Sequence, residues 1–122
     1  MAISYRIDSA QKAIYTALVG EVTDQQLLRH AGEIEGDPEI DGSFVELIQA
    51  DTNSMKGVTG SGVRAAADAL RASTAIRKLG IVASRNEEFG LGRMVELLAD
   101  ESLIEIQVFR DQEDARSWLG IG

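Results

Sequence analysis

The chain has 122 residues, of which 44% are hydrophobic and 26% charged, and it is long enough to form one domain with an ordinary core. It contains no cysteine, which excludes disulfides, thiolate metal sites and cysteine nucleophiles. The net charge of -8 argues against a general nucleic-acid-binding protein, because contacts with phosphates need a cationic surface. No apolar run approaches the roughly 18–20 residues that span a bilayer, and the first residues lack a secretory pattern. We therefore expect a soluble, cytoplasmic protein without a transmembrane segment.

The beginning of the chain predicts two strands and a helix. Residues 3–7 alternate between apolar and polar side chains, and residues 13–19 form a β-branched and aromatic run. The short turn between these runs predicts a hairpin. Thr23 and Gln26 match a capping box, which predicts a helix that ends near Gly36.

Strands and helices alternate in the rest of the chain. The predicted elements are a buried strand at 44–50, a helix from the turn at 57–61 to Ser73, a strand at 79–83, a helix ending near Asp100, a strand at 104–109 and a short helix capped by Asp111. This order predicts a single α/β domain over residues 1–122. It would contain one sheet of about five mostly parallel strands after the N-terminal hairpin, together with about four helices.

The third predicted helix has two candidate caps and one apolar face. Ser84 begins an S-x-x-E capping box, and Asn86 is an equally suitable cap. The residues predicted to form its apolar face are Phe89, Met94, Val95, Leu97 and Leu98. Gly90 and Gly92 in its first turns weaken the helix locally or let another group approach its backbone closely.

Residues suited to catalysis or metal binding are few. His30 is the only histidine, it has no second histidine at metal-binding spacing, and we expect it on the surface of the first helix. The alternating acidic residues between Glu33 and Asp41 are expected to be solvated rather than to bind a cation. No nucleophile, phosphate-binding or dinucleotide-binding motif is present. The sequence thus predicts a protein that is not an enzyme and has no catalytic residues, metal or cofactor.

Ser61 lies between Gly60 and Gly62 at the start of the second predicted helix. It has two interpretations. In the first, its side chain is the N-cap of the helix. In the second, Ser61 is a phosphorylation site, because a phosphate at a helix N-terminus is stabilised by backbone N–H groups and by the helix dipole.

Positive charge is concentrated in the same part of the chain. Between Lys56 and Arg93 the sequence has seven basic and three acidic residues, a local charge of +4, whereas the remainder carries -12. Solvated arginines on helix surfaces are one explanation, and a surface that binds an anion at the helix N-termini is the other. The residues predicted to bind a partner or an anion are Thr59, Gly60, Ser61, Gly62, Arg64, Arg85 and Arg93.

The order of elements, with a serine turn between the third strand and the second helix, resembles the STAS domain of anti-sigma-factor antagonists of the SpoIIAA type. In that family the turn commonly reads Asp-Ser-Ser-Gly-Leu-Gly, and its second serine is phosphorylated by a partner kinase that is also the anti-sigma factor. Residues 59–64 occupy these places, so the resemblance implies that Ser61 is the phosphorylated position. Thr59 replaces the aspartate and Arg64 the last glycine. Residues 89–94 and 108–119 look more like a divergent SpoIIAA-like branch, for which the fold suggests lipid or small-ligand binding.

Two functions follow as hypotheses. The first is a non-enzymatic regulatory or binding module that engages a protein partner or an anionic ligand through the Ser61 turn. The second is a carrier of a lipid or small apolar acid, with a pocket between the third helix and the sheet. Phe89, Leu91 and Met94 would line that pocket, and Arg93 would bind the acid group, although core packing also explains these apolar residues. If the first strand lies at a sheet edge, a homodimer is also expected.

Overall fold

The computed structural model describes residues 2–122, which form five strands and four helices. The strands are β1 (Ile3–Asp8), β2 (Ala13–Leu18), β3 (Phe44–Ala50), β4 (Ile76–Val82) and β5 (Glu105–Phe109). The helices are α1 (Asp24–Gly36), α2 (Gly60–Ala72), α3 (Asn86–Leu98) and α4 (Gln112–Leu119). The predicted α/β fold is therefore confirmed.

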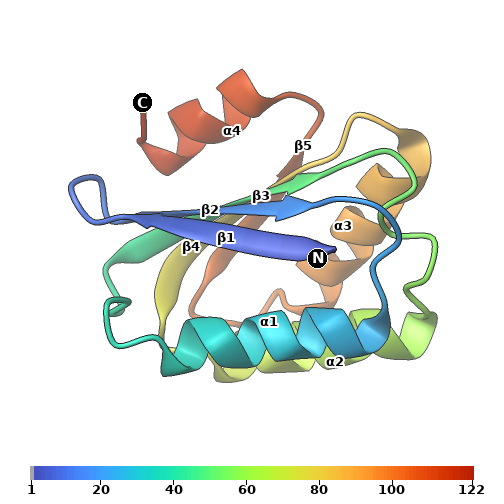
Figure 1. Ribbon diagram of the computed structural model, residues 1–122, viewed down its shortest axis with the longest axis horizontal. Coiled ribbons are helices and arrows are strands. Elements are labelled where there is room, and N and C mark those ends of the chain that lie inside the picture. The colour runs from blue at the N-terminus through green and yellow to red at the C-terminus, as the bar shows by residue number, and fades with distance from the viewer. Residues whose placement is uncertain (1) are drawn as a thin grey trace.

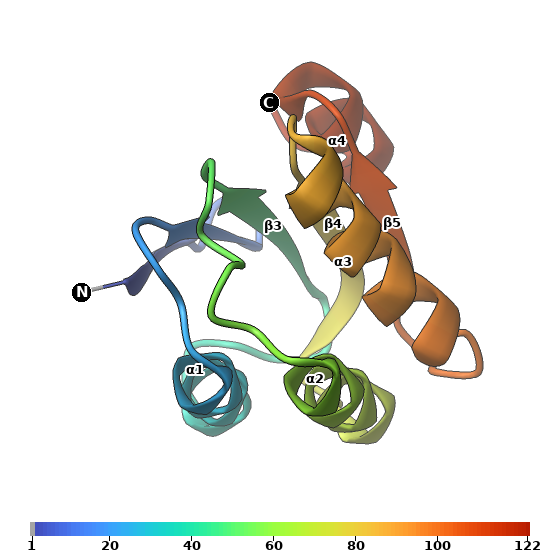
Figure 2. The same cartoon turned by 90° about the vertical axis from the view of Figure 1, so that its right-hand side faces the viewer.

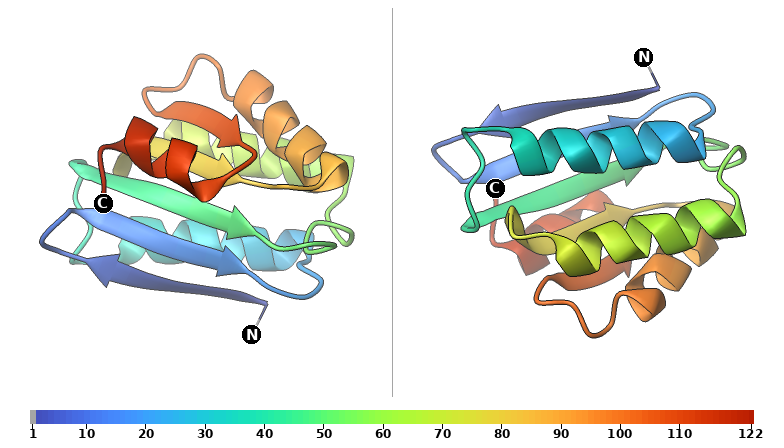
Figure 3. Two further views of the ribbon diagram at one scale, coloured as in Figure 1. Left: turned by 90° about the horizontal axis from the view of Figure 1, so that it is seen from above. Right: turned by 90° about the horizontal axis from the view of Figure 1, so that it is seen from below.

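The five strands form one sheet in the order β1-β2-β3-β4-β5. The hairpin pair β1–β2 is antiparallel, and the pairs from β2 to β5 are parallel. Helices α1, α2 and α3 lie on one face of the sheet, and α4 covers the other (Figures 1 and 3). Within the described residues β1 pairs only with β2 and occupies one edge of the sheet, and the homodimer expected from such an edge stays a prediction.

Local sequence signals determine several of the element ends. Thr23 caps α1, and its side chain and that of Gln26 form the predicted capping box. Asp111 caps α4 by accepting a hydrogen bond from the N–H of Asp114. Strand β4 begins at Ile76, three residues earlier than predicted from the apolar run. The sequence pattern misses this part of the strand because the charged side chains of Arg77 and Lys78 interrupt the apolar run. Their backbone nevertheless belongs to the sheet.

The face of the sheet under α4 has a closely packed core. Val45, Leu47 and Val82 from the sheet pack with Ala115 and Leu119 from α4. Gly80 in β4 allows this close approach, since a Cβ at that position would lie 3.1 Å from Leu119 Cδ1. The opposite face has its own core, and it also contains the candidate site described below.

Helix α3 is rotated relative to the prediction. Its buried residues are Glu88, Gly92 and Val95, whereas Met94 and Leu97 of the predicted apolar face are 45% and 62% exposed. The cause is Gly92, where a Cβ would lie 3.0 Å from Val108 Cγ2 of β5. The helix approaches the sheet most closely at this glycine, so its larger apolar side chains are turned outward.

The two caps predicted for α3 are wrong. The N-cap is Arg85, whose side chain makes no capping hydrogen bond. Asn86 Oδ1 instead accepts a hydrogen bond of 2.8 Å from Arg110 Nη1. This long-range contact uses the side chain that would otherwise be available for capping.

Candidate functional site

A cavity of about 420 Å³ lies between the sheet and helices α1, α2 and α3. Its wall is mostly apolar. It is lined by Leu18, Ile48, Leu79 and Ile81 from the sheet, Leu27, Leu28 and Ile34 from α1, Ala66, Ala69 and Leu70 from α2, and Gly92 and Val95 from α3, among other residues. The small side chains on α2 leave volume beneath the sheet that larger residues would fill. Figure 2 shows α1 and α2 side by side below the strands.

Helices α1 and α2 are joined at both ends by carboxylate side chains of α1. At the start, Asp24 accepts hydrogen bonds from the hydroxyl and the backbone N–H of Thr59, at 2.6 and 2.9 Å. At the other end, Glu35 accepts hydrogen bonds from the Ser73 hydroxyl and from the backbone N–H of Thr74, the latter at 3.2 Å. These two clamps fix the helix pair that forms the floor of the cavity.

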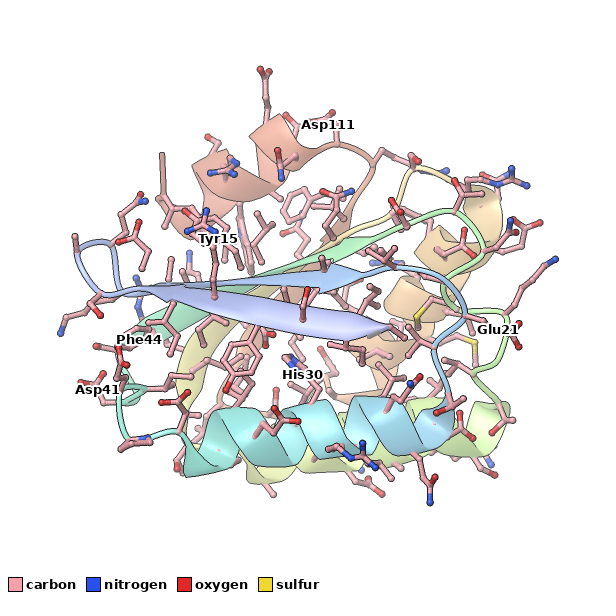
Figure 4. The ribbon with its side chains drawn as sticks, in the orientation of Figure 1. Tyr15, Glu21, His30, Asp41, Phe44 and Asp111 are labelled. Atoms are coloured by element: carbon pink, nitrogen blue, oxygen red, sulfur yellow. The ribbon has the colours of Figure 1, made fainter. Side chains whose placement is uncertain are left out.

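Two ionisable side chains meet in the cavity wall. Glu46 lies in the middle of β3 and is 4% exposed, and His30 lies on α1 and is 8% exposed. The distance from His30 Nε2 to Glu46 Oε2 is 2.7 Å, and the Thr16 hydroxyl donates a 2.6 Å hydrogen bond to the same oxygen. The ring of Tyr5 contacts His30 edge-on, with 5.5 Å between ring centroids. Figure 4 shows His30 between the sheet and α1.

The position of His30 corrects the prediction that it lies on the helix surface. Burial lowers its pKa, but the hydrogen bond with Glu46 and the negative charge of Glu46 raise it by more, so the pKa of His30 lies above its ordinary value. The local pattern of α1 does not reveal a partner 16 residues away. The sequence feature that could have indicated a buried partner is Glu46, the one charged residue within the apolar run of β3.

Glu88 is a second buried carboxylate in the wall of the same cavity. It lies in the first turn of α3 and is 3% exposed, and its Oε1 atom is buried without a hydrogen-bond partner among the described residues. A buried acceptor without a donor is unusual, because it has lost its water without replacement. The sequence does not distinguish Glu88 from its exposed neighbour Glu87, because acidic residues are common in the first turn of any helix.

Ser61 is not the N-cap of α2, so that interpretation is wrong. The cap is Thr59, whose hydroxyl accepts a hydrogen bond of 3.1 Å from the N–H of Gly62, while Ser61 is exposed. The Asp24 carboxylate also lies at this helix start, and a Cβ on Gly62 would overlap it. Hydrogen bonds from the side chain and the backbone of Thr59 lower the pKa of Asp24. A carboxylate of the protein itself therefore lies where the sequence predicts an external anion.

The arginines predicted to bind an anion lie on α2 and α3 or directly before α3. Helices α2 and α3 both begin at the edge of the sheet where the parallel strands end (Figure 1). Arg64 is exposed on α2, Arg85 precedes α3 and lies 3.7 Å from a carboxylate oxygen of Glu87, and Arg93 forms an ion pair with Glu96. Acidic neighbours thus compensate part of the positive charge. A role for these residues and for Gly60 in binding a partner stays a prediction.

The residues predicted to line a pocket near α3 lie outside the cavity. Phe89 and Leu91 pack against the core cluster that contains Leu18, Val22, Ala50, Met55 and Ala83, and Met94 is exposed. Arg110 lies over the ring of Phe89, 4.0 Å from its centroid. Helix α3 borders the cavity through Glu88, Gly92 and Val95 instead, because it approaches the sheet at its glycine.

Residues 2–122 contain neither a candidate membrane span nor a candidate metal site. None of the helices there has both the length and the hydrophobicity to span a bilayer. The described part of the chain also contains no group of three or more histidine and acidic side chains that could hold a metal ion.

One solved structure shares the arrangement of strands and helices described above. It is the crystal structure of an uncharacterized protein of the DUF3478 family, with a SpoIIAA-like fold, from Shewanella loihica PV-4. The similarity covers 97% of this chain and 94% of the other, with a TM-score of 0.62 and 17% sequence identity. No protein-family model matches the sequence, and no curated protein is significantly similar to it. The chain therefore has a SpoIIAA-like α/β fold.

Proposed function

We propose that this protein is a non-enzymatic binding module whose ligand site is the cavity between the sheet and helices α1, α2 and α3. The observation that carries the proposal is the cavity itself, at about 420 Å³ and with a mainly apolar wall. Small-molecule sites commonly have about 300–1,000 Å³ and combine an apolar lining with a few polar groups. Here Glu46, His30 and Glu88 supply buried polar groups, and Glu35 and Ser73 also border the cavity.

The chemistry of the wall argues against the apolar acid suggested by the sequence. The Oε1 atom of Glu88 in the cavity wall lacks a donor, and a bound carboxylate would bring it a second acceptor instead of a donor. His30 is already engaged by Glu46 at 2.7 Å. A neutral or cationic apolar molecule fits this wall better.

A regulatory partner that binds the Ser61 turn is the second candidate. Its support is the SpoIIAA-like fold together with the exposure of Ser61. The Asp24 carboxylate already lies at the start of α2, against Gly62, and a phosphate on Ser61 would add further negative charge to the same helix terminus. We therefore favour the cavity as the site of function.

The cavity proposal predicts that the protein binds the neutral dye N-phenylnaphthylamine and that Ala69→Leu weakens this binding about tenfold or more, about 1.4 kcal/mol. Ala69 lines the cavity, and the larger side chain would occupy the volume that the dye needs. The measurement is a fluorescence titration of protein purified without detergent.

The matched control is Ala65→Leu, which makes the same change one turn earlier on α2 at a residue outside the cavity lining. This variant should bind the dye as tightly as the wild type. If the dye does not bind to the wild type, or if Ala69→Leu binds it unchanged, the cavity is not a ligand site.

A further inference from the structure

We infer that the ligand of this cavity carries a protonated amine on an apolar chain and that Glu88 is the group that binds the amine. The inference rests on the proposed function and specifies its ligand class. Glu88 is the buried carboxylate of the cavity whose Oε1 atom has no hydrogen-bond donor among the described residues.

The two buried carboxylates of the cavity differ in their partners. Glu46 accepts a hydrogen bond from Thr16 and is paired with His30, so it already has partners within the protein. Glu88 has no ion pair with any described residue, and it is 3% exposed. Of the two, Glu88 is therefore the acceptor left for a ligand.

Glu88 lies at the N-terminal end of α3, and its Oε1 atom lacks a donor among the described residues. It lies in the first turn of α3, where the positive end of the helix dipole stabilises a negative charge. Arg85, the N-cap, makes no side-chain capping bond there. A protonated amine that reached the buried Oε1 atom would supply the missing donor, and a hydrogen bond with an ionised donor is roughly twice as strong as one between neutral groups.

The remainder of the wall determines the other end of the ligand. Leu27, Leu79 and Ile81 represent a lining that is mostly aliphatic. Such a wall excludes water and accepts an alkyl chain, which gains free energy as its surface leaves water. The fitting chemical class is thus an aliphatic amine.

Three probes with the same alkyl chain and different head groups test the inference. Octylamine, octanol and octanoate are titrated against the complex of the full chain with N-phenylnaphthylamine, and displacement of the dye is measured. We expect octylamine to displace the dye at a concentration at least tenfold lower than octanol, and octanoate to be weaker than both.

Two variants assign this preference to a residue. Glu88→Gln should reduce the preference for octylamine over octanol to less than threefold while its binding of octanol is retained, which shows that its cavity is intact. Glu87→Gln removes the same charge from the adjacent exposed position and should retain the preference.

The outcomes distinguish the amine inference from the cavity proposal. If octanol and the dye bind but octylamine is no better than octanol, or if Glu88→Gln keeps the preference, the amine inference is overturned and the cavity proposal stands. If neither the dye nor any of the three probes binds to the wild type, the cavity proposal fails, and the amine inference fails with it.

Discussion

His30→Leu is expected to lower the free energy of unfolding by about 3–5 kcal/mol, because it leaves a buried carboxylate without its charged partner. Glu46 is 4% exposed, and its Oε2 atom lies 2.7 Å from His30 Nε2. After the substitution only the Thr16 hydroxyl would remain as a donor to that oxygen. Urea denaturation near pH 6, followed by circular dichroism, measures the change.

A triple variant tests whether the loss of stability comes from the unpaired carboxylate or from the lost imidazole. Thr16→Val and Glu46→Leu are combined with His30→Leu, so that no buried hydroxyl or carboxylate is left without a partner. Replacing a complete buried ion pair by apolar residues is often neutral or stabilising, so the triple variant should lie within about 1 kcal/mol of the wild type or above it. If the triple variant is as unstable as His30→Leu, this explanation is wrong.

The same pair predicts how stability depends on pH. The folded-state pKa of His30 is raised, so its protonation contributes stability that is fully present below the unfolded-state pKa of about 6.5 and is lost as the pH rises through the folded-state value. Glu46 and Glu33 are the acidic groups that favour the proton. The free energy of unfolding of the wild type should fall over this interval, and the triple variant should lack the fall. Equal pH profiles of the two proteins would contradict the assignment.

Glu88→Leu is expected to stabilise the protein in the absence of ligand. A buried acceptor without a partner costs about 1–3 kcal/mol, and loss of an acid from the first turn of a helix costs about 0.3–1 kcal/mol. The second term is subtracted from the first, so the free energy of unfolding should rise by about 1–2 kcal/mol. Leucine also has a higher helix propensity than most residues and would extend the apolar wall of the cavity. Urea denaturation without added ligand is the measurement.

Glu87→Leu is the control for that gain. Glu87 is the neighbouring residue in the first turn of α3, and its side chain is 68% exposed. Its replacement removes the same charge without relieving a buried group, so it should not stabilise the protein. A loss of stability on Glu88→Leu would mean that the carboxylate has a partner in the folded protein. A gain would show that the buried carboxylate costs stability in the absence of ligand, as is common for groups that bind ligands.

Much of the fold can be predicted from the sequence because its signals are local. The capping box of Thr23 and Gln26, the Asp111 cap and the apolar run of β3 each involve residues within a few positions of one another. These signals place most element boundaries within two residues. The alternation of strands and helices then leads to a parallel sheet.

The candidate site depends on contacts that a local pattern does not contain. His30 and Glu46 are 16 residues apart, and Asp24 and Thr59 are 35 residues apart. Each pair forms only after α1 has packed below the sheet and beside α2. Glu88 becomes buried because α3 is rotated by its contact at Gly92, which the apolar residues of the helix do not indicate.

The clamps at the two ends of α1 and α2 limit how the molecule can move. Asp24 ties the starts of the two helices together and Glu35 ties their ends, so separation of one helix from the other breaks hydrogen bonds at a terminus. Displacement of the pair as one body relative to the strands breaks none of these bonds. A shear of the two helices together is therefore the movement that these clamps allow, and it would have to break the contact between His30 on α1 and Glu46 on β3.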